Sequence, residues 1–298
     1  MVYPAVGPDG EVYLVWRDQN ADTIEITKSV NAGNPQATPT FNAFGGGGVG
    51  GLDLTIDLGH DPIGMPQNPV GFHAVWAAVD RTNGQRRGHV YVLWADERNG
   101  DVDIYLARST DGGFTWQTGI RVNDDPLGNG KDQWMAMMDI APDGRLDAAW
   151  YDCRNDPANW LSELYYSSSA DGGLTWSANR RLSDAFDTTV GFPVQQKIGD
   201  YTQVLSDETG AHIAYAATFN GGQDIYYLRA SADPLAGDLD GDGDVDLGDF
   251  LMFQLCFGGS SNPPAPTCPP GREPDLDGDG DVDLADFLIF QQNFTGSF

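Results

Sequence analysis

The pattern of apolar residues divides the chain into two regions. Up to about residue 231, short aromatic and β-branched runs alternate with turns rich in Gly, Asp and Asn, which is typical of β-strands. After residue 238 the apolar residues recur at helical spacing in two similar sets. These sets are Leu247, Phe250, Leu251 and Phe257, and Leu284, Phe287, Leu288 and Phe294. The pattern predicts an all-β domain over residues 1–231, a linker at 232–237 and a small helical domain over 238–298.

The strand runs of the first region repeat along the chain. Four segments begin with glycine and continue into an apolar strand: 10–16, 88–94, 144–150 and 210–215. Each is followed by the start of a third strand, and the last unit lacks an obvious outer strand. Units of four strands are typical of the blades of a β-propeller. We therefore expect four visible blades.

A second repeat follows the third strand of two units. It has the pattern S-x-D-x-G-x-T-W, called an Asp box, and its residues are Ser109, Asp111, Gly113, Thr115 and Trp116, then Ser169, Asp171, Gly173, Thr175 and Trp176. With these boxes, residues 1–231 resemble the sialidase and BNR-repeat superfamily. The resemblance implies that the boxes are structural and that a complete propeller has six blades. Our hypothesis is that the sequence is an N-terminally truncated piece of a longer secreted protein.

The sialidase resemblance also implies a catalytic site on the face opposite the Asp boxes. Such a site needs arginines for a carboxylate, a tyrosine nucleophile paired with glutamate, and an aspartate acid/base. Residues of these types are Arg98 and Arg154, Tyr201 with Glu97, and Asp96 or Asp152. The Asp-x-Arg pairs recur in consecutive units, however, which favours salt bridges that fix the loops. Both a sialidase-like glycoside hydrolase and a non-catalytic propeller that binds glycan or protein therefore stay open.

The second region is an internal duplication with an offset of 37 residues (275 − 238). Each copy places acids at positions 1, 3, 5, 9 and 12 of a calcium loop and glycine at position 6. We expect position 7 to offer its backbone carbonyl with a free side chain, and Val245 and Val282 to pair in a β-bridge. No helix precedes either loop. The candidate ligands are Asp238, Asp240, Asp242, Asp244, Asp246 and Asp249, then Asp275, Asp277, Asp279, Asp281, Asp283 and Asp286.

These two half-EF-hand repeats resemble a dockerin type I domain. The resemblance implies two calcium ions, calcium-coupled folding and a cohesin-like or cell-surface protein partner. Leucine at positions 247 and 284 departs from the hydroxylic or basic residues expected for cohesin contact. Cys256 and Cys268 bracket the proline-rich connector, so we expect a disulfide and an extracellular location.

Charge narrows the range of partners. The chain has 298 residues and a net charge of −28, and from Gly237 onward we count 13 acids and one base, Arg272. So acidic a protein would repel nucleic acid and anionic membranes. No apolar run reaches the roughly 18 residues that a membrane span needs, and residues 1–4 show no leader peptide. We expect a glycan or glycoprotein ligand, no membrane insertion and no zinc, since the four histidines lack ligand spacing.

Overall fold

The computed structural model describes residues 2–18, 23–42, 49–55, 75–191, 194, 198–199, 202–231, 236–240, 245–269, 272 and 274–295. The chain forms two compact units. The first, called the sheet domain here, comprises Met1–Asn179 and Ser183–Ala230. The second, the tail domain, comprises Arg180–Leu182 and Ser231–Phe298. Each is described separately below.

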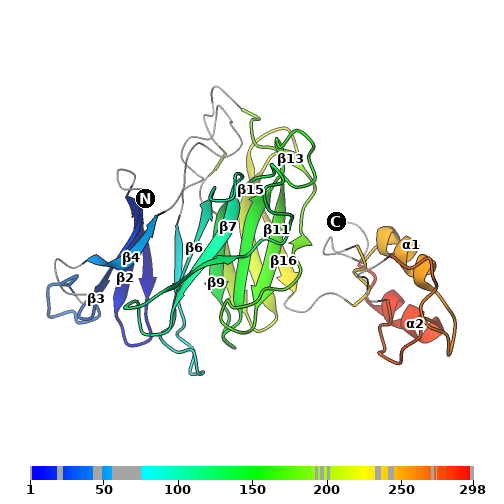
Figure 1. The fold of residues 1–298 in the computed structure, drawn as a ribbon, viewed down its shortest axis with the longest axis horizontal. Coiled ribbons are helices and arrows are strands. Elements are labelled where there is room, and N and C mark those ends of the chain that lie inside the picture. The colour runs from blue at the N-terminus through cyan, green and yellow to red at the C-terminus, as the bar shows by residue number, and fades with distance from the viewer. Residues whose placement is uncertain are drawn as a thin grey trace. The chain divides into compact units, whose positions relative to one another are not determined.

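The described strands form four sheets whose strands pair largely in chain order (Figure 1). The first holds β1 (Val2–Val6), β2 (Val12–Asp18), β3 (Thr23–Ser29) and β4 (Val49–Thr55). The second holds β5 (Trp76–Val79), β6 (Val90–Asp96), β7 (Asp103–Ser109) and β8 (Gln117–Arg121). The third holds β9 (Gln133–Ile140), β10 (Leu146–Asp152) and β11 (Leu161–Ser169), with the short strands β12 (Arg180–Arg181) and β13 (Phe186–Asp187) on β11. The fourth holds β14 (Gln203–Asp207), β15 (Gly210–Ala217) and β16 (Asp224–Ser231).

These sheets correspond to the four repeat units of the sequence, and the described part of the last one has three strands. The first strand of each sheet contacts the first strand of the next, in the order β1, β5, β9 and β14. Tyrosines join neighbouring sheets, since Tyr13 Oη donates to Gly112 O at 3.2 Å. Likewise Tyr151 Oη donates to Ala216 O at 2.7 Å and accepts from Ala216 N at 3.0 Å. A buried phenol needs such a partner, so these contacts fix how adjacent sheets pack.

The tail domain contains two helices, α1 (Leu247–Cys256) and α2 (Leu284–Gln292), among its described residues (Figure 1). Each begins with a capping box, in which Asp246 or Asp283 is the N-cap and Asp249 or Asp286 is at N3. Each helix directly follows an acidic loop, as the sequence predicted. The small core contains Leu239, Val245, Phe253, Cys256, Val282 and Phe290.

The predicted β-bridge between Val245 and Val282 is wrong. The carbonyl of Val282 accepts instead from Gly258 N at 3.0 Å, and that of Val245 accepts from Thr295 N at 2.9 Å. Positions 258 and 295 differ by the repeat offset (295 − 258 = 37). The segment that follows each helix therefore forms a backbone hydrogen bond with the loop of the other repeat. The side chains of Val245 and Val282 are both fully buried.

No helix among the described residues is both long and apolar enough to span a bilayer.

Candidate functional sites

Both Asp boxes form the same hydrogen-bonded turn. In each, the serine hydroxyl donates to the aspartate carboxylate at 2.8 Å, and the threonine hydroxyl donates to the other carboxylate oxygen at 2.7 Å. The glycine amide, Gly113 N or Gly173 N, donates to the serine Oγ at 2.8 Å. Burial by itself would raise the pKa of Asp111 and Asp171, but these bonds outweigh it and lower each to about 2. The turn is held by charge-assisted bonds and has a structural role.

The candidate residues Asp96 and Asp152 end the strands β6 and β10, and the candidates Arg98 and Arg154 lie in the loops that follow. Asp96 accepts from Trp94 Nε1 at 3.1 Å and from Arg98 Nε at 2.9 Å. Asp152 repeats this, accepting from Trp150 Nε1 at 2.9 Å and from Arg154 Nε at 3.0 Å. Both aspartates have no exposed surface.

Each of these arginines also lies over a tyrosine ring of the third strand. The guanidinium carbon of Arg98 is 4.2 Å from the ring centroid of Tyr105, and that of Arg154 is 4.3 Å from that of Tyr165. The unit is therefore a repeated W-x-D-x-R-N motif, because Asn99 and Asn155 donate to the same tyrosine hydroxyls. This geometry favours the scaffold interpretation for all four candidate residues.

Arg154 has further partners that occupy the rest of its guanidinium. Its Nη1 donates to Asp124 at 2.7 Å and its Nη2 to Asn179 at 2.9 Å. Burial raises the pKa of Asp152, and Arg154 offsets part of that shift. A substrate carboxylate would have to displace these partners.

A buried polar network that sequence reasoning missed joins the second and third sheets. Asn123 donates to Asp103 at 2.8 Å and to Gln133 at 2.7 Å, and Gln133 donates to Asp152 at 3.3 Å. Arg121 pairs with Asp103 and with Asp125. The longest of these contacts link residues 18 to 20 positions apart on different strands and loops, so no local spacing signals them.

Of the remaining catalytic candidates, Glu97 lies among the described residues. Glu97 follows Asp96 in the loop after β6 and is half-buried. Tyr201 lies outside the described residues. Trp134 in β9 is fully buried, and its Nε1 donates to Ser162 at 3.2 Å, so its ring is not available for stacking on a sugar. The Cys153 thiol is also buried, which raises its pKa.

A cavity of about 670 Å³ is lined by the first strand of every sheet. Its wall includes the aromatic pair Tyr3 and Trp76, whose ring centroids are 4.4 Å apart. Asp139 and Ser206 face it as well, and Ser206 N donates to Asp139 at 2.8 Å. Burial raises the pKa of Asp139. Aromatic rings beside polar groups in a concave site suit a small polar ligand such as a sugar.

The acidic loops of the tail domain bring carboxylates together as the spacing predicts. Oxygens of Asp238, Asp240 and Asp249 lie within 4.8 Å of one another, and so do those of Asp275, Asp277 and Asp286. Asp242 and Asp244 lie outside the described residues. Calcium takes hard oxygen ligands at about 2.3–2.6 Å, so both groups fit this ion. When bound, calcium would neutralise carboxylates that otherwise repel one another.

The aspartate at position 12 of each loop, besides being a candidate calcium ligand, also accepts hydrogen bonds from the loop backbone. Asp249 accepts from Asp240 N and from Asp246 N, each at 2.9 Å. Asp286 accepts from Asp277 N at 3.1 Å and from Asp283 N at 2.7 Å. Both carboxylates are fully buried. They tie the two ends of each loop to the helix that follows.

The expectation of a free side chain at position 7 is wrong for the second loop. Asp281 is buried, and one of its carboxylate oxygens accepts from Ser261 N in the connector. Sequence reasoning failed here because the connector's fold over the second loop is a tertiary contact.

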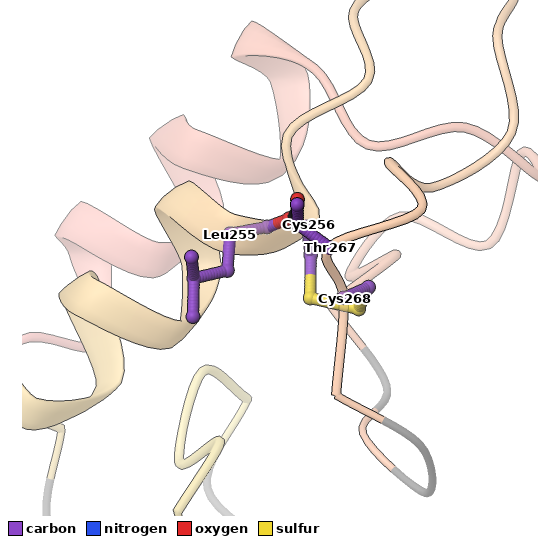
Figure 2. Close-up of a disulfide and its surroundings, with 4 residues drawn as sticks. All are labelled: Leu255, Cys256, Thr267 and Cys268. Atoms are coloured by element: carbon purple, nitrogen blue, oxygen red, sulfur yellow. Dashed lines mark hydrogen bonds between the residues drawn. A yellow bond between two sulfur atoms is a disulfide. The ribbon is translucent and has the colours of Figure 1, made fainter.

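Cys256 and Cys268 form the predicted disulfide, which closes the connector after α1 (Figure 2). Thr267 Oγ1 donates to Leu255 O beside it, and Ala265 N donates to Cys256 O at 2.9 Å. The bridge therefore holds the end of α1 against the end of the connector.

Leucines of both helices point away from the small core. Leu247 and Leu251 of α1 are 68% and 63% exposed, and Leu284 and Leu288 of α2 are 68% and 57% exposed. Each pair is spaced i, i+4, which places the two side chains on one helix face. Two similar apolar faces follow from the duplication.

Residues 88–228 match the BNR repeat-like domain family, and residues 236–295 match the dockerin type I domain family. The chain therefore carries a BNR repeat-like domain followed by a dockerin type I domain. This agrees with the resemblances inferred from the Asp boxes and the acidic loops.

Among curated proteins, none matches the chain. Solved structures that match the chain include a protein of unknown function from Dyadobacter fermentans, with 15% identity, 78% of this chain and 61% of that chain covered, and a TM-score of 0.43. An α-L-arabinofuranosidase from Lactobacillus brevis has 17% identity, coverage of 78% and 67%, and a TM-score of 0.42. One from Fusarium graminearum has 14% identity, coverage of 82% and 68%, and a TM-score of 0.46. The chain thus spans 61% to 68% of the length of these three structures, and no activity transfers at this similarity.

Proposed function

We propose that the chain is an extracellular protein in which a glycan-directed β-propeller is attached to a protein partner by a calcium-folded docking domain. One observation carries the proposal, namely the exposed leucine pairs on α1 and α2 of a domain that matches the dockerin family. A domain this small buries few apolar residues, so leaving four leucines in water is costly unless a partner covers them. A helix face with i, i+4 anchors fits a complementary apolar surface.

The calcium loops serve this function by holding the helices. The N-cap residue of each helix is the position-9 aspartate of the loop before it. The position-12 aspartate of each loop lies in the first turn of the helix and accepts hydrogen bonds from the loop backbone. Without calcium these carboxylates repel one another, and the two leucine faces lose their support. Docking should therefore require calcium even though the leucines are not its ligands.

Titration of the full-length protein with type I cohesin domains tests the docking proposal. We expect binding in calcium and none in EDTA. Substitution of all four leucines (Leu247→Lys, Leu251→Lys, Leu284→Lys and Leu288→Lys) should weaken binding at least about 30-fold, which corresponds to about 2 kcal/mol for an interface hot spot. Leu127→Lys is the matched control, because Leu127 is an exposed leucine of the sheet domain (62%). Equal affinity of the quadruple variant and the control would refute the role of these faces.

The sheet domain is proposed to supply the glycan-directed activity. Its cavity offers aromatic rings beside polar groups, which supports binding of a sugar. Binding without hydrolysis is the form we favour, because Asp96 and Asp152 have no exposed surface and Arg154 is fully engaged. Sialidase-like hydrolysis, with Tyr201 as nucleophile and Glu97 as its partner, is the alternative.

A glycan array and a fluorogenic sialoside assay on the full-length protein distinguish the two. We expect glycan binding without turnover, and weaker binding by Asn83→Ala, which alters the cavity wall. Turnover that Tyr201→Phe abolishes would instead establish the hydrolase. Neither binding nor turnover with any glycan would overturn a glycan-directed function.

A further inference from the structure

Neighbouring sheets of the sheet domain pack on each other through two different faces. The face of the first sheet that bears Tyr13 and Val15 shares one hydrophobic core with the face of the second sheet that bears Val92 and Trp94. We call the side of a sheet that turns toward the next sheet in chain order its forward face, and the opposite side its rear face. Each contact between consecutive sheets therefore joins a forward face to a rear face.

The forward face of the fourth sheet is exposed. Val204 and Ile213, on its rear face, are fully buried. Side chains alternate between the two faces along a strand, so Leu205 lies on the forward face with Ile225 and Tyr227. All three of these apolar side chains are exposed. Their burial against another sheet would remove a large apolar area from water.

The rear face of the first sheet is exposed as well. Val2 pairs with Trp16 and Val6 with Val12 across β1 and β2, so these four side chains share one face. They alternate with Tyr13, which lies on the forward face. Val2 and Val6 are exposed, and Val12 and Trp16 are only half-buried. The chain thus carries one exposed forward face and one exposed rear face.

Polar groups fix the contact between the forward face of the first sheet and the second sheet. Tyr13 and Lys28 are cross-strand neighbours on that face. Tyr13 Oη and Lys28 Nζ both donate to Gly112 O, in the first Asp box, at 3.2 and 3.3 Å. A cross-strand polar pair on a forward face therefore binds a backbone carbonyl in the Asp box of the next sheet.

The fourth sheet carries a polar pair at the same place. His212 lies opposite Leu205 in the register, as Tyr13 lies opposite Ala5 in the first sheet. Nδ1 of His212 is 2.6 Å from Tyr227 Oη, and the two rings stack with their centroids 6.1 Å apart. Tyr227 is exposed, whereas Tyr13 is fully buried. This pair is placed to meet the carbonyl of a further Asp-box turn.

The first sheet offers such a turn after β3. Ser29 Oγ donates to Asn31 Oδ1 at 2.9 Å, which repeats the first bond of each Asp box. Ala32 lies three residues after the serine, as Gly112 does in the first Asp box. The carbonyl of Ala32 therefore has the position that the Gly112 carbonyl has in the second sheet.

We infer that the forward face of the fourth sheet docks on the rear face of the first sheet of a second copy of this chain, and that two copies pair through two such contacts. One chain carries both halves of a contact that its own sheets already make three times, which is why a second copy fits these faces. The contact is head-to-tail, because each copy contributes a different face to it. Two copies supply eight sheets, within the range of about four to eight blades in propellers, so the pair can close.

The mass of the full-length protein in solution tests this inference. Sedimentation equilibrium in calcium should give the mass of two chains. Ile225→Asp places a charge in the contact and should weaken pairing at least about 30-fold, the loss expected for an interface hot spot. Leu127→Asp is the matched control, because Leu127 is equally exposed (62% against 63%) in a turn outside both faces. It should pair as tightly as the wild type.

A mixture of two variants tests whether unlike faces meet. Val2→Asp alters the rear face of the first sheet and should by itself give single chains, as Ile225→Asp does. In an equimolar mixture an intact forward face can meet an intact rear face, so mixed pairs should form. If Val2→Asp alone pairs as tightly as the wild type, two forward faces meet and the inference is overturned. Both residues are exposed, and an unchanged thermal transition confirms that each variant is folded.

Two further results would overturn the inference. A wild type with the mass of one chain at every concentration tested does so without any variant. Pairing that disappears in EDTA, or in the quadruple leucine variant of α1 and α2, would place the contact on the tail domain instead. We expect pairing to persist in both cases, because the two faces belong to the sheet domain.

Discussion

In the sheet domain, buried aspartates lie directly against arginines. Asp96 pairs with Arg98, Asp147 with Arg145 and Asp152 with Arg154, and the three carboxylates have no exposed surface. In the tail domain Asp249 and Asp286 are equally buried, yet the sequence from Gly237 to Phe298, which holds both acidic loops, contains a single base, Arg272. The sheet domain thus neutralises its buried charge internally, and the tail domain depends on ions from solution. The two domains should respond differently to the same perturbations.

Calcium removal should produce the largest difference between them. With EDTA we expect the tail domain to unfold and the sheet domain to keep its own thermal transition. Each ion contributes about 4 kcal/mol when free calcium exceeds Kd a thousandfold. Calorimetry with and without EDTA measures both transitions. A tail transition that EDTA leaves unchanged would contradict the dependence on ions.

Arg145→Met should have the opposite effect to calcium removal, because it should destabilise the sheet domain and leave the stability of the tail domain unchanged. Arg145 binds both oxygens of Asp147, at 2.9 and 3.0 Å, and its loss leaves that carboxylate buried without its cation. The expected cost is about 3–5 kcal/mol, independent of calcium. Arg87→Met is the control, because its ion pair with Asp9 is exposed and contributes about 0–1 kcal/mol. Chemical denaturation monitored by tryptophan fluorescence gives both values.

Removing the disulfide should have an intermediate effect confined to the tail domain. The bridge joins residues 12 positions apart, and a loop of this size contributes about 3 kcal/mol in the chain-entropy description. The double variant Cys256→Ala, Cys268→Ala should therefore need more calcium to fold, which a calcium titration followed by circular dichroism shows. Cys153→Ala, which removes a buried thiol of the sheet domain, should leave that titration unchanged. An unchanged midpoint in the double variant would contradict the prediction.

A substitution in an Asp box should cause the smallest loss of stability among these changes. Asp111→Ala removes hydrogen bonds from Ser109 and Thr115 at an exposed turn, so we expect a loss of about 1 kcal/mol from the sheet domain. The pKa of Asp111 is about 2 when folded, below its unfolded value of about 3.9. Its contribution is therefore present above about pH 4 and disappears as the pH falls toward 2. Urea unfolding of wild type and variant at pH 7 and at pH 2 tests this, and Thr110→Ala in the same turn is the control.

Several features of the sites could be read from local spacing. The acids of both calcium loops, the helices that follow them and the cysteine pair lie within short segments whose geometry the backbone fixes. The recurring Asp-x-Arg pairs were also visible in the sequence, but their role was not. Either substrate contact or a scaffold role fitted the sequence. Burial of Asp96 and Asp152 against tryptophan and arginine is what favours the scaffold role.

The positions of strands, loops and helices could be predicted from the sequence, because apolar periodicity and turn residues act over a few neighbouring positions. The two acidic loops of the tail and the helices after them were also predictable in this way. That Val245 and Val282 bond to the segments after the opposite helices became visible only in the folded chain. The same holds for the contact by which the connector buries Asp281. These contacts join residues 20 to 50 positions apart, so they depend on how packed elements meet, and no pattern within one element encodes that.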